Sequence, residues 1–203
     1  VWAAQEARIE AGEYFFVLAS FPCSSSSAAR HNPHRMAGPG PLWACWPQKH
    51  RWGNPQLSGE YKEHVRLGNL HALRAAKAAS IQIRTGRGMA RENPQPGRQP
   101  PSLFYREPLT ELLALGAKDV DSAQCPFGAS SANRTRLRHF RGTFAKLELQ
   151  LCRHPDRDWW DADTGRRYWK PHATLASAHD SNGAWETKGS EAYPDLLITA
   201  LAQ

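Results

Sequence analysis

A lone cysteine follows an apolar run near the beginning of the sequence. Residues 20–27 read SFPCSSSS, so Cys23 stands directly after a proline and before four serines. A cysteine nucleophile needs a thiolate in an exposed, electropositive setting, and a position just past a strand supplies the exposure. The alternative is a buried cysteine with a structural role, because cysteine is among the most buried residue types. The residue type alone leaves both interpretations open.

A carboxyl group that could work beside this nucleophile occurs in RENP, residues 91–94. Glu92 could donate a proton to a reacting group if it were held in its protonated form. The alternative is a surface carboxylate ahead of the turn that Pro94 favours.

The segment richest in arginine is RTRLRHFR, residues 134–141. Alternate residues of an extended chain lie on one side, so Arg134, Arg136 and Arg138 would form a row. Together with Arg141, they could bind phosphate or a base carbonyl oxygen through paired hydrogen bonds. The alternative is a solvated basic edge strand.

A zinc site is a competing possibility in the last quarter of the chain. Cys152, His154 and His172 are potential ligands there, and Cys125 could complete a set of four. Their spacing differs from the paired ligands that structural zinc sites usually show, so a packed Trp/His loop is the alternative.

The overall charge favours an anionic partner. The 203 residues carry 26 Lys and Arg against 19 Asp and Glu, a net charge of +7. Nucleic acid is the commonest partner of such a chain, and the charge leaves DNA and RNA open. The four cysteines form no CxxC pair, which favours a reducing, intracellular compartment (nuclear or cytoplasmic) over secretion.

Neither a membrane span nor a leader is expected. The longest apolar run, YFFVLASF, is far too short to cross a bilayer. The first residues carry alternating charges and lack the apolar centre of a signal peptide. Since the first residue is Val, we expect the chain to be a piece of a longer product.

Strand and helix patterns alternate along the chain. The patterns predict helices over 3–11, 60–86 and 109–116 and strands over 13–20 and 88–94. They also predict a strand that ends in a turn over 118–128, and a strand pair with a turn at Gly142 over 137–151. The apolar run 13–20 has the character of a strand buried on both faces. Alternation of this kind predicts an open α/β sheet, in which sites form at the carboxyl ends of strands. Cys23, Glu92 and Cys125 each follow or end a predicted strand.

Five motifs in order carry a family resemblance. FPCSSSSAAR, LGNLHALRAA, ARENP, QCPFG and RTRL occur within residues 13–140. This order resembles the cytosine-C5 DNA methyltransferases, and more closely the methylase-like domains of retroelement-type proteins. The resemblance implies an α/β fold: a partial Rossmann-like methyltransferase sheet over 1–145, with an irregular Trp/His-rich extension over 146–203.

The resemblance also implies a mechanism. Cys23 would attack C6 of a flipped cytosine as a thiolate, and Glu92 would protonate N3. Arg134 and Arg136 would bind the base carbonyl oxygen and orient the glutamate. C5 would then accept a methyl group from S-adenosylmethionine.

The family's cofactor motif has no counterpart in this sequence. That motif is a glycine turn after the first strand of the family's fold, upstream of the PC motif, and no GxG stands near a strand end before Cys23. S-adenosylmethionine is therefore implied by the resemblance alone, and methyl transfer is left open. The alternatives are a nucleic-acid-binding remnant without enzymatic activity and a small zinc-stabilised interaction domain.

Overall fold

The computed structural model describes seven parts of the chain: residues 1–20, 52–95, 102–129, 134–142, 144, 159–161 and 166–168. The residues form two compact units. The first consists of Val1–Asp119 with Arg136–Gly142, and the second of Val120–Thr135 with Thr143–Gln203. Each unit is described by itself below.

The described elements are mostly those that the patterns predict. The helices are α1 (Trp2–Glu10), α2 (Gly59–Arg84) and α3 (Glu107–Ala114), with short 3₁₀ turns η3 (Leu103–Tyr105) and η4 (Cys125–Phe127). The strands are β1 (Phe16–Ser20), β2 (Gly88–Pro94), β3 (Lys118–Ala123), β4 (Arg134–Phe140), β5 (Trp159–Asp161) and β6 (Arg166–Tyr168). The chain is thus a mixed α/β protein, as predicted.

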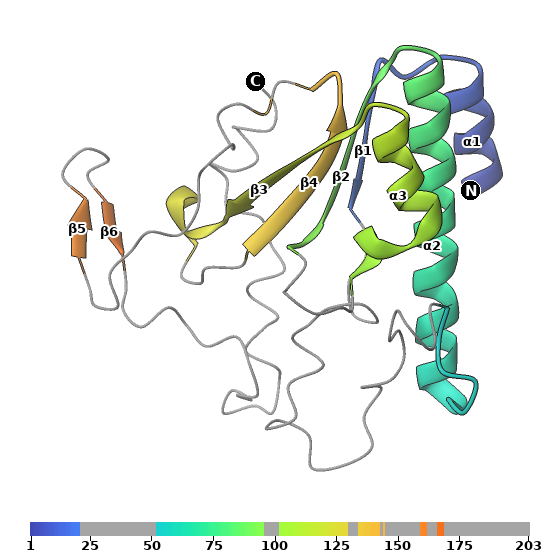
Figure 1. The fold of residues 1–203 in the computed structure, drawn as a ribbon, viewed down its shortest axis with the longest axis horizontal. Helices are drawn as coiled ribbons and strands as arrows, with labels where there is room; N and C mark the ends of the chain where they lie inside the picture. The colour runs from blue at the N-terminus through green and yellow to red at the C-terminus, as the bar shows by residue number, and fades with distance from the viewer. Residues whose placement is uncertain are drawn as a thin grey trace. The chain divides into compact units, whose positions relative to one another are not determined.

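Four strands form one sheet in the order β1-β2-β4-β3 (Figure 1). β1 and β2 are parallel, with a register that runs from Phe16 opposite Gly88 to Ser20 opposite Glu92. β4 runs against its neighbours. Its last residue, Phe140, lies close to Gly116 just before β3, and the side chain of Arg141 bonds to a carbonyl just before β2. The sheet is therefore mixed.

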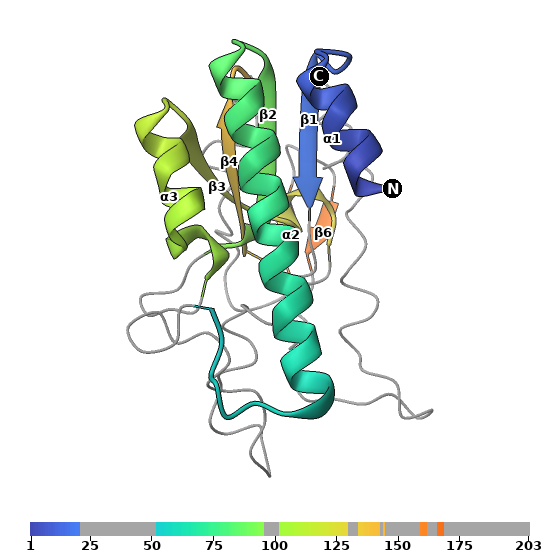
Figure 2. The ribbon, with the colours of Figure 1, turned by 90° about the vertical axis from the view of Figure 1, so that its right-hand side faces the viewer.

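All three helices cover the same face of β1, β2 and β4 (Figures 1 and 2). The core between them is built from small helix residues and larger strand and loop residues. Its buried members are Ala72, Ala76, Ala79, Ile83, Met89, Leu103, Leu109, Leu112 and Ala117. The alanines of α2 let the helix approach the sheet closely.

Two glycines turn α2 and α3 into the strands that follow. Gly86 and Gly116 adopt left-handed backbone angles, with φ of +69° and +96°. The amides after them, Arg87 N and Ala117 N, donate to helix carbonyls five residues back, which closes each helix with a Schellman-type cap. Each strand starts within two residues, so local chemistry fixes where β2 and β3 begin.

The prediction that the first strand is buried on both faces is wrong. Leu18 of β1 is 50% exposed, and Phe15 just before the strand is 87% exposed. β1 ends the sheet order and pairs with β2 alone among the described strands. A strand at the end of the sheet order has a neighbouring strand on one side only. The apolar side chains of β1 are therefore less buried than the run of hydrophobic residues predicts.

In the second unit, β5 and β6 form a short antiparallel pair in a region that the patterns left unassigned, with Trp159 opposite Tyr168. No helix in the described ranges combines the length and the apolar character that a membrane crossing requires.

Candidate functional site

The carboxyl ends of β1 and β2 meet at one edge of the sheet. Ser20, the last residue of β1, lies opposite Glu92 in the parallel register. The Ser20 hydroxyl donates a hydrogen bond to Glu92 Oε2 over 3.0 Å. This bond joins residues 72 positions apart, and it places the carboxylate next to the strand that leads to Cys23.

Buried neighbours set the direction in which Glu92 leaves the strand. Arg91 and Asn93 are 1% and 2% exposed, whereas Glu92 is partly exposed. Successive side chains of a strand alternate between its faces, so Glu92 lies on the face opposite that of Arg91. The Asn93 side-chain amide donates to the Glu92 carbonyl over 2.6 Å and helps to hold the backbone there.

Arg91, an unusual residue for an interior strand, lies on the helix-covered side. Its guanidinium stands 5.4 Å from the centre of the buried Phe104 ring. Burial, together with the charges of Arg138 and Arg106, lowers the pKa of Arg91 to about 9, while the charge of Glu92 acts in the opposite direction. Arg91 is therefore close enough to Arg138 and Arg106 for their charges to repel its own.

Arg138 is an internal structural residue of the first unit. It is 2% exposed, and Nε and Nη2 donate to the two Asp119 oxygens over 2.7 and 2.8 Å. Nη1 donates to the Leu109 carbonyl over 2.6 Å, and the guanidinium also lies over Phe104, 5.0 Å from the ring centre. This placement corrects the prediction of a solvent-facing arginine row at position 138, because the guanidinium is committed to internal partners.

The other three predicted arginines lie in different settings. Arg134, described in the second unit, is exposed. Arg136 is partly exposed and forms a 3.5 Å ion pair with Asp119, sharing the face of Arg138. Arg141 has a positive φ of 54° and donates to the Gly86 carbonyl. The roles of Arg134 and Arg136 beside a base therefore stay predictions, and Arg141 ties β4 to the turn before β2.

Several predicted ligands and the predicted nucleophile lie outside the described residues. These are Cys23, Cys152, His154 and His172. Cys125 is described, and it is fully buried in η4. In the part of the chain that the structure describes, no group of three or more His, Cys, Asp or Glu side chains could hold a metal.

The described residues do not fit a site for S-adenosylmethionine. The resemblance calls for a glycine turn after a strand, but Gly12, Gly86 and Gly116, which have positive φ, stand before β1, β2 and β3. Gly128 follows β3, but it ends η4 and does not lead from a strand into a helix. Within the described ranges, no strand passes through a glycine turn directly into a helix. No chemical step is derived through this cofactor.

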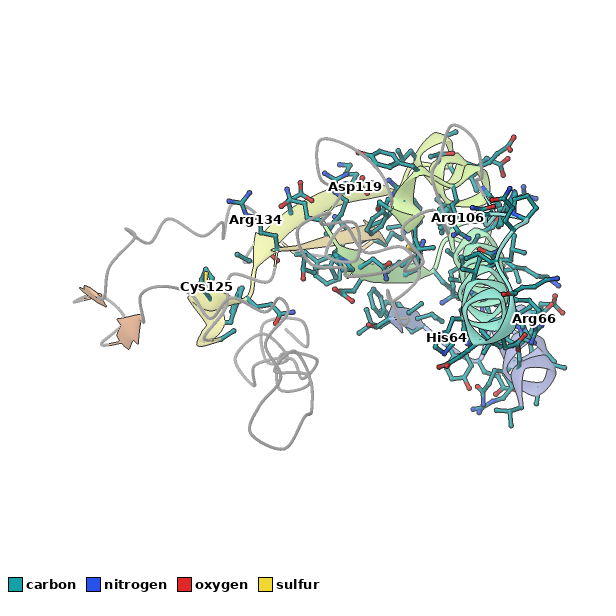
Figure 3. All side chains as sticks on the ribbon, turned by 90° about the horizontal axis from the view of Figure 1, so that it is seen from below. His64, Arg66, Arg106, Asp119, Cys125 and Arg134 are labelled. Carbon is teal, nitrogen blue, oxygen red and sulfur yellow. The ribbon has the colours of Figure 1, made fainter. Side chains whose placement is uncertain are left out.

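One motif of the resemblance lies within a helix. Gly68 and Asn69 of LGNLHALRAA are part of α2, in the range where the patterns predict a helix. The Asn69 side chain donates to the Trp52 carbonyl and accepts from the Arg106 guanidinium. Arg106 stands beside α2, and Asp119 lies on β3, both labelled in Figure 3.

The sequence patterns missed two residues of this region, Ser20 and Asp119. Ser20 could have been found from its position at the end of the strand before Cys23. Asp119 gave a weaker signal, an acidic residue near the start of a strand with arginines on a later one. Compared with protein-family models, curated proteins and solved structures, the chain gives no match.

Proposed function

We propose that the chain binds DNA and that Cys23 adds to C6 of an unpaired cytosine beside Glu92. The observation that carries the proposal is the 3.0 Å hydrogen bond between Ser20 and Glu92 at the carboxyl ends of two parallel strands. Three residues of chain span at most about 11 Å, so covalent geometry keeps Cys23 within that distance of Ser20. This reach supports the proposal that the nucleophile and the acid of the resemblance act together at one edge of the sheet.

The addition needs both groups. As the Cys23 sulfur bonds to C6, the electron pair of the C5–C6 double bond moves through C4 to N3. N3 takes a proton from Glu92, which is left as a carboxylate. No group leaves the base, and reversal of the same steps restores it. The base must first leave its stack to reach the edge of the sheet, as in other enzymes that act on bases.

The proposal ends at this covalent adduct. Methyl transfer from S-adenosylmethionine belongs to the resemblance, since the described residues provide no site for that cofactor. The pairing of β1 with β2 supports the adduct, and this pairing does not depend on the family's cofactor motif.

The test is covalent trapping on duplex DNA that carries 2-pyrimidinone in place of one cytosine. An adduct would appear by intact mass as the sum of protein and DNA masses. The adduct should be absent in Cys23→Ala and present in Cys45→Ala, which removes another cysteine of the same region. Circular dichroism would establish that each variant is folded. A folded chain that gives no adduct, or a Cys23→Ala chain that still gives one, would overturn the proposal.

A second candidate is nucleic-acid binding without covalent chemistry, favoured by the exposed Arg134 and the net charge of +7. When binding depends on phosphate contacts, the logarithm of the binding constant falls linearly with the logarithm of the salt concentration. Arg134→Ala should reduce the slope of that linear relation by about 1. Salt-dependent binding without an adduct would leave this candidate in place of the first.

A further inference from the structure

An exposed tryptophan is held in place by a side-chain network of the first unit. Trp52 is 44% exposed, and it lies in the segment that leads into α2. Its carbonyl accepts a hydrogen bond from the Asn69 side-chain amide. Its ring has the Arg106 guanidinium 5.3 Å from the centre. The backbone and the ring are therefore both anchored.

The two anchors are themselves connected. Asn69 Oδ1 accepts a hydrogen bond from Arg106 Nη1, so one amide links Trp52 to Arg106. Arg106 is 5% exposed, and its backbone begins α3, where its carbonyl accepts from Leu109 N and Thr110 N over 2.9 Å each. A ring supported in this way has lost much of its freedom before any partner arrives.

A second exposed aromatic stands next to the same arginine. Tyr105, the last residue of η3, is 46% exposed. The chain here is fixed by Ser102, whose hydroxyl accepts from Phe104 N over 3.2 Å, and by the buried Phe104 itself. One exposed ring thus lies over the buried Arg106 guanidinium, and a second exposed ring stands one residue earlier in the chain. Aromatic rings combined with arginine are the usual components of surfaces that bind unpaired bases.

Arg106, whose guanidinium lies over the Trp52 ring, also lies near β2. Arg106 is close enough to Arg91 for the two charges to interact, and Arg91 directly precedes Glu92 in β2. The chain also enters η3 soon after β2 ends at Pro94.

From these contacts we infer that Trp52, held by Asn69 and Arg106, is a stacking platform for an unpaired base of a bound nucleic acid. The exposed Tyr105 is a second candidate ring. The inference deepens the proposed function and rests on it, because it assumes a nucleic-acid partner. Because the ring is already held in place, binding costs little side-chain entropy. The net charge of +7 attracts a polyanion to the protein.

The test compares two fluorescent single strands of equal length, an oligodeoxythymidylate and its abasic counterpart, by anisotropy at fixed salt. Trp52→Leu should weaken binding of the strand with bases by roughly 5- to 150-fold and leave the abasic strand unaffected. Trp52→Phe should retain most of the affinity because a ring remains. Phe15→Leu is the matched control. Phe15 is 87% exposed, but it lies just before β1, at the end of β1 away from Ser20. Its replacement should leave the affinity for both oligonucleotides unchanged.

The outcomes separate this inference from the proposed function. If the wild-type chain binds neither strand, the nucleic-acid partner fails, and the platform fails with it. If the wild-type chain binds and Trp52→Leu binds equally well, only the platform is wrong. Equal affinity of the wild type for both strands would also refute stacking. Should Trp52→Leu not fold, Tyr105→Leu serves as the second variant, with a smaller loss expected on the strand with bases alone.

Discussion

Arg138 and Asp119 are joined at two points, Nε to Oδ1 over 2.7 Å and Nη2 to Oδ2 over 2.8 Å. The pair links β4 to β3, and the third nitrogen of the guanidinium reaches the Leu109 carbonyl of α3. A cation at 2% exposure can persist only if its donors are satisfied and its charge is balanced. Among the described contacts, the Asp119 carboxylate balances the positive charge of Arg138.

Removal of Asp119 should therefore destabilise the protein strongly. Asp119→Ala leaves the Arg138 charge buried without its carboxylate, and breaking one partner of a buried pair costs about 3–5 kcal/mol. Urea unfolding followed by circular dichroism would measure the loss. Glu111→Ala removes an exposed carboxylate from α3 and should change stability by no more than about 0.5 kcal/mol. Equal stability of the two variants would contradict a structural role for the pair.

Arg91 should respond in the opposite way. Burial, aided by repulsion from Arg138 and Arg106, lowers the pKa of Arg91 to about 9, so the folded chain disfavours this charge. Arg91→Met keeps the length and apolar stem of the side chain and removes the charge. Because a buried charge is costly, the variant should unfold at a urea concentration no lower than that of the wild type. A clear decrease in the urea midpoint would show instead that the guanidinium is needed for the fold.

The sequence predicted where the helices and strands lie more accurately than it predicted which of their side chains are buried. β2 was predicted over 88–94 and spans Gly88–Pro94, because a glycine and a proline bound it in the sequence. The helix predicted over 60–86 is α2, but its larger residue Leu73 is 44% exposed, whereas Ala72 and Ala76 are buried. The packed face consists largely of alanines, whose small side chains carry little weight in a hydrophobic pattern.

The candidate site was predictable only in part. Glu92 and the strand before Cys23 could be singled out from motif order, but their adjacency depends on the register of β1 against β2, which contacts distant in sequence decide. The burial of Arg138 could not be predicted from its own segment, because its balancing charge lies 19 residues earlier on another strand. The alternation of side chains along the strand placed the arginines on one face of it, but did not show that helices cover that face.

Glu92 should govern the rate at which the pyrimidinone adduct forms. Glu92→Gln keeps an oxygen that can accept from Ser20 and removes the carboxylic acid proton. Since general acid catalysis contributes roughly 10²–10⁴-fold, the rate of adduct formation should fall within that range. Ser20→Ala should give a smaller loss, because it removes only the group that orients the carboxylate. Quenched time points read by intact mass would provide the rates.

Glu111→Gln is the control for this series, as an exposed carboxylate on α3. It should trap the analogue at the wild-type rate. Wild-type rates in Glu92→Gln would show that N3 obtains its proton elsewhere, and the role of Glu92 would have to be withdrawn even if Cys23 were the nucleophile.

The contact between α1 and α2 should make stability depend on pH. Lys77 of α2 donates to Glu6 of α1, and this hydrogen bond holds the pKa of Glu6 below its usual 4.5, with a further contribution from the Trp2 indole. The same bond raises the pKa of Lys77 above 10.5. Since the folded pKa of Glu6 is depressed, its contribution to stability is present above about pH 4.5 and lost as the pH falls through the folded value.

Glu6→Gln should therefore lower the melting temperature at neutral pH, and its difference from the wild type should vanish in acid, well below pH 4.5. Because the pair is partly solvent-exposed, high salt should also reduce the difference. Glu10→Gln is the comparison, since its carboxylate lies 3.8 Å from the same ammonium and should matter less. A difference between wild type and Glu6→Gln that persists unchanged in acid would mean that the side chain stabilises α1 by packing and not by its charge.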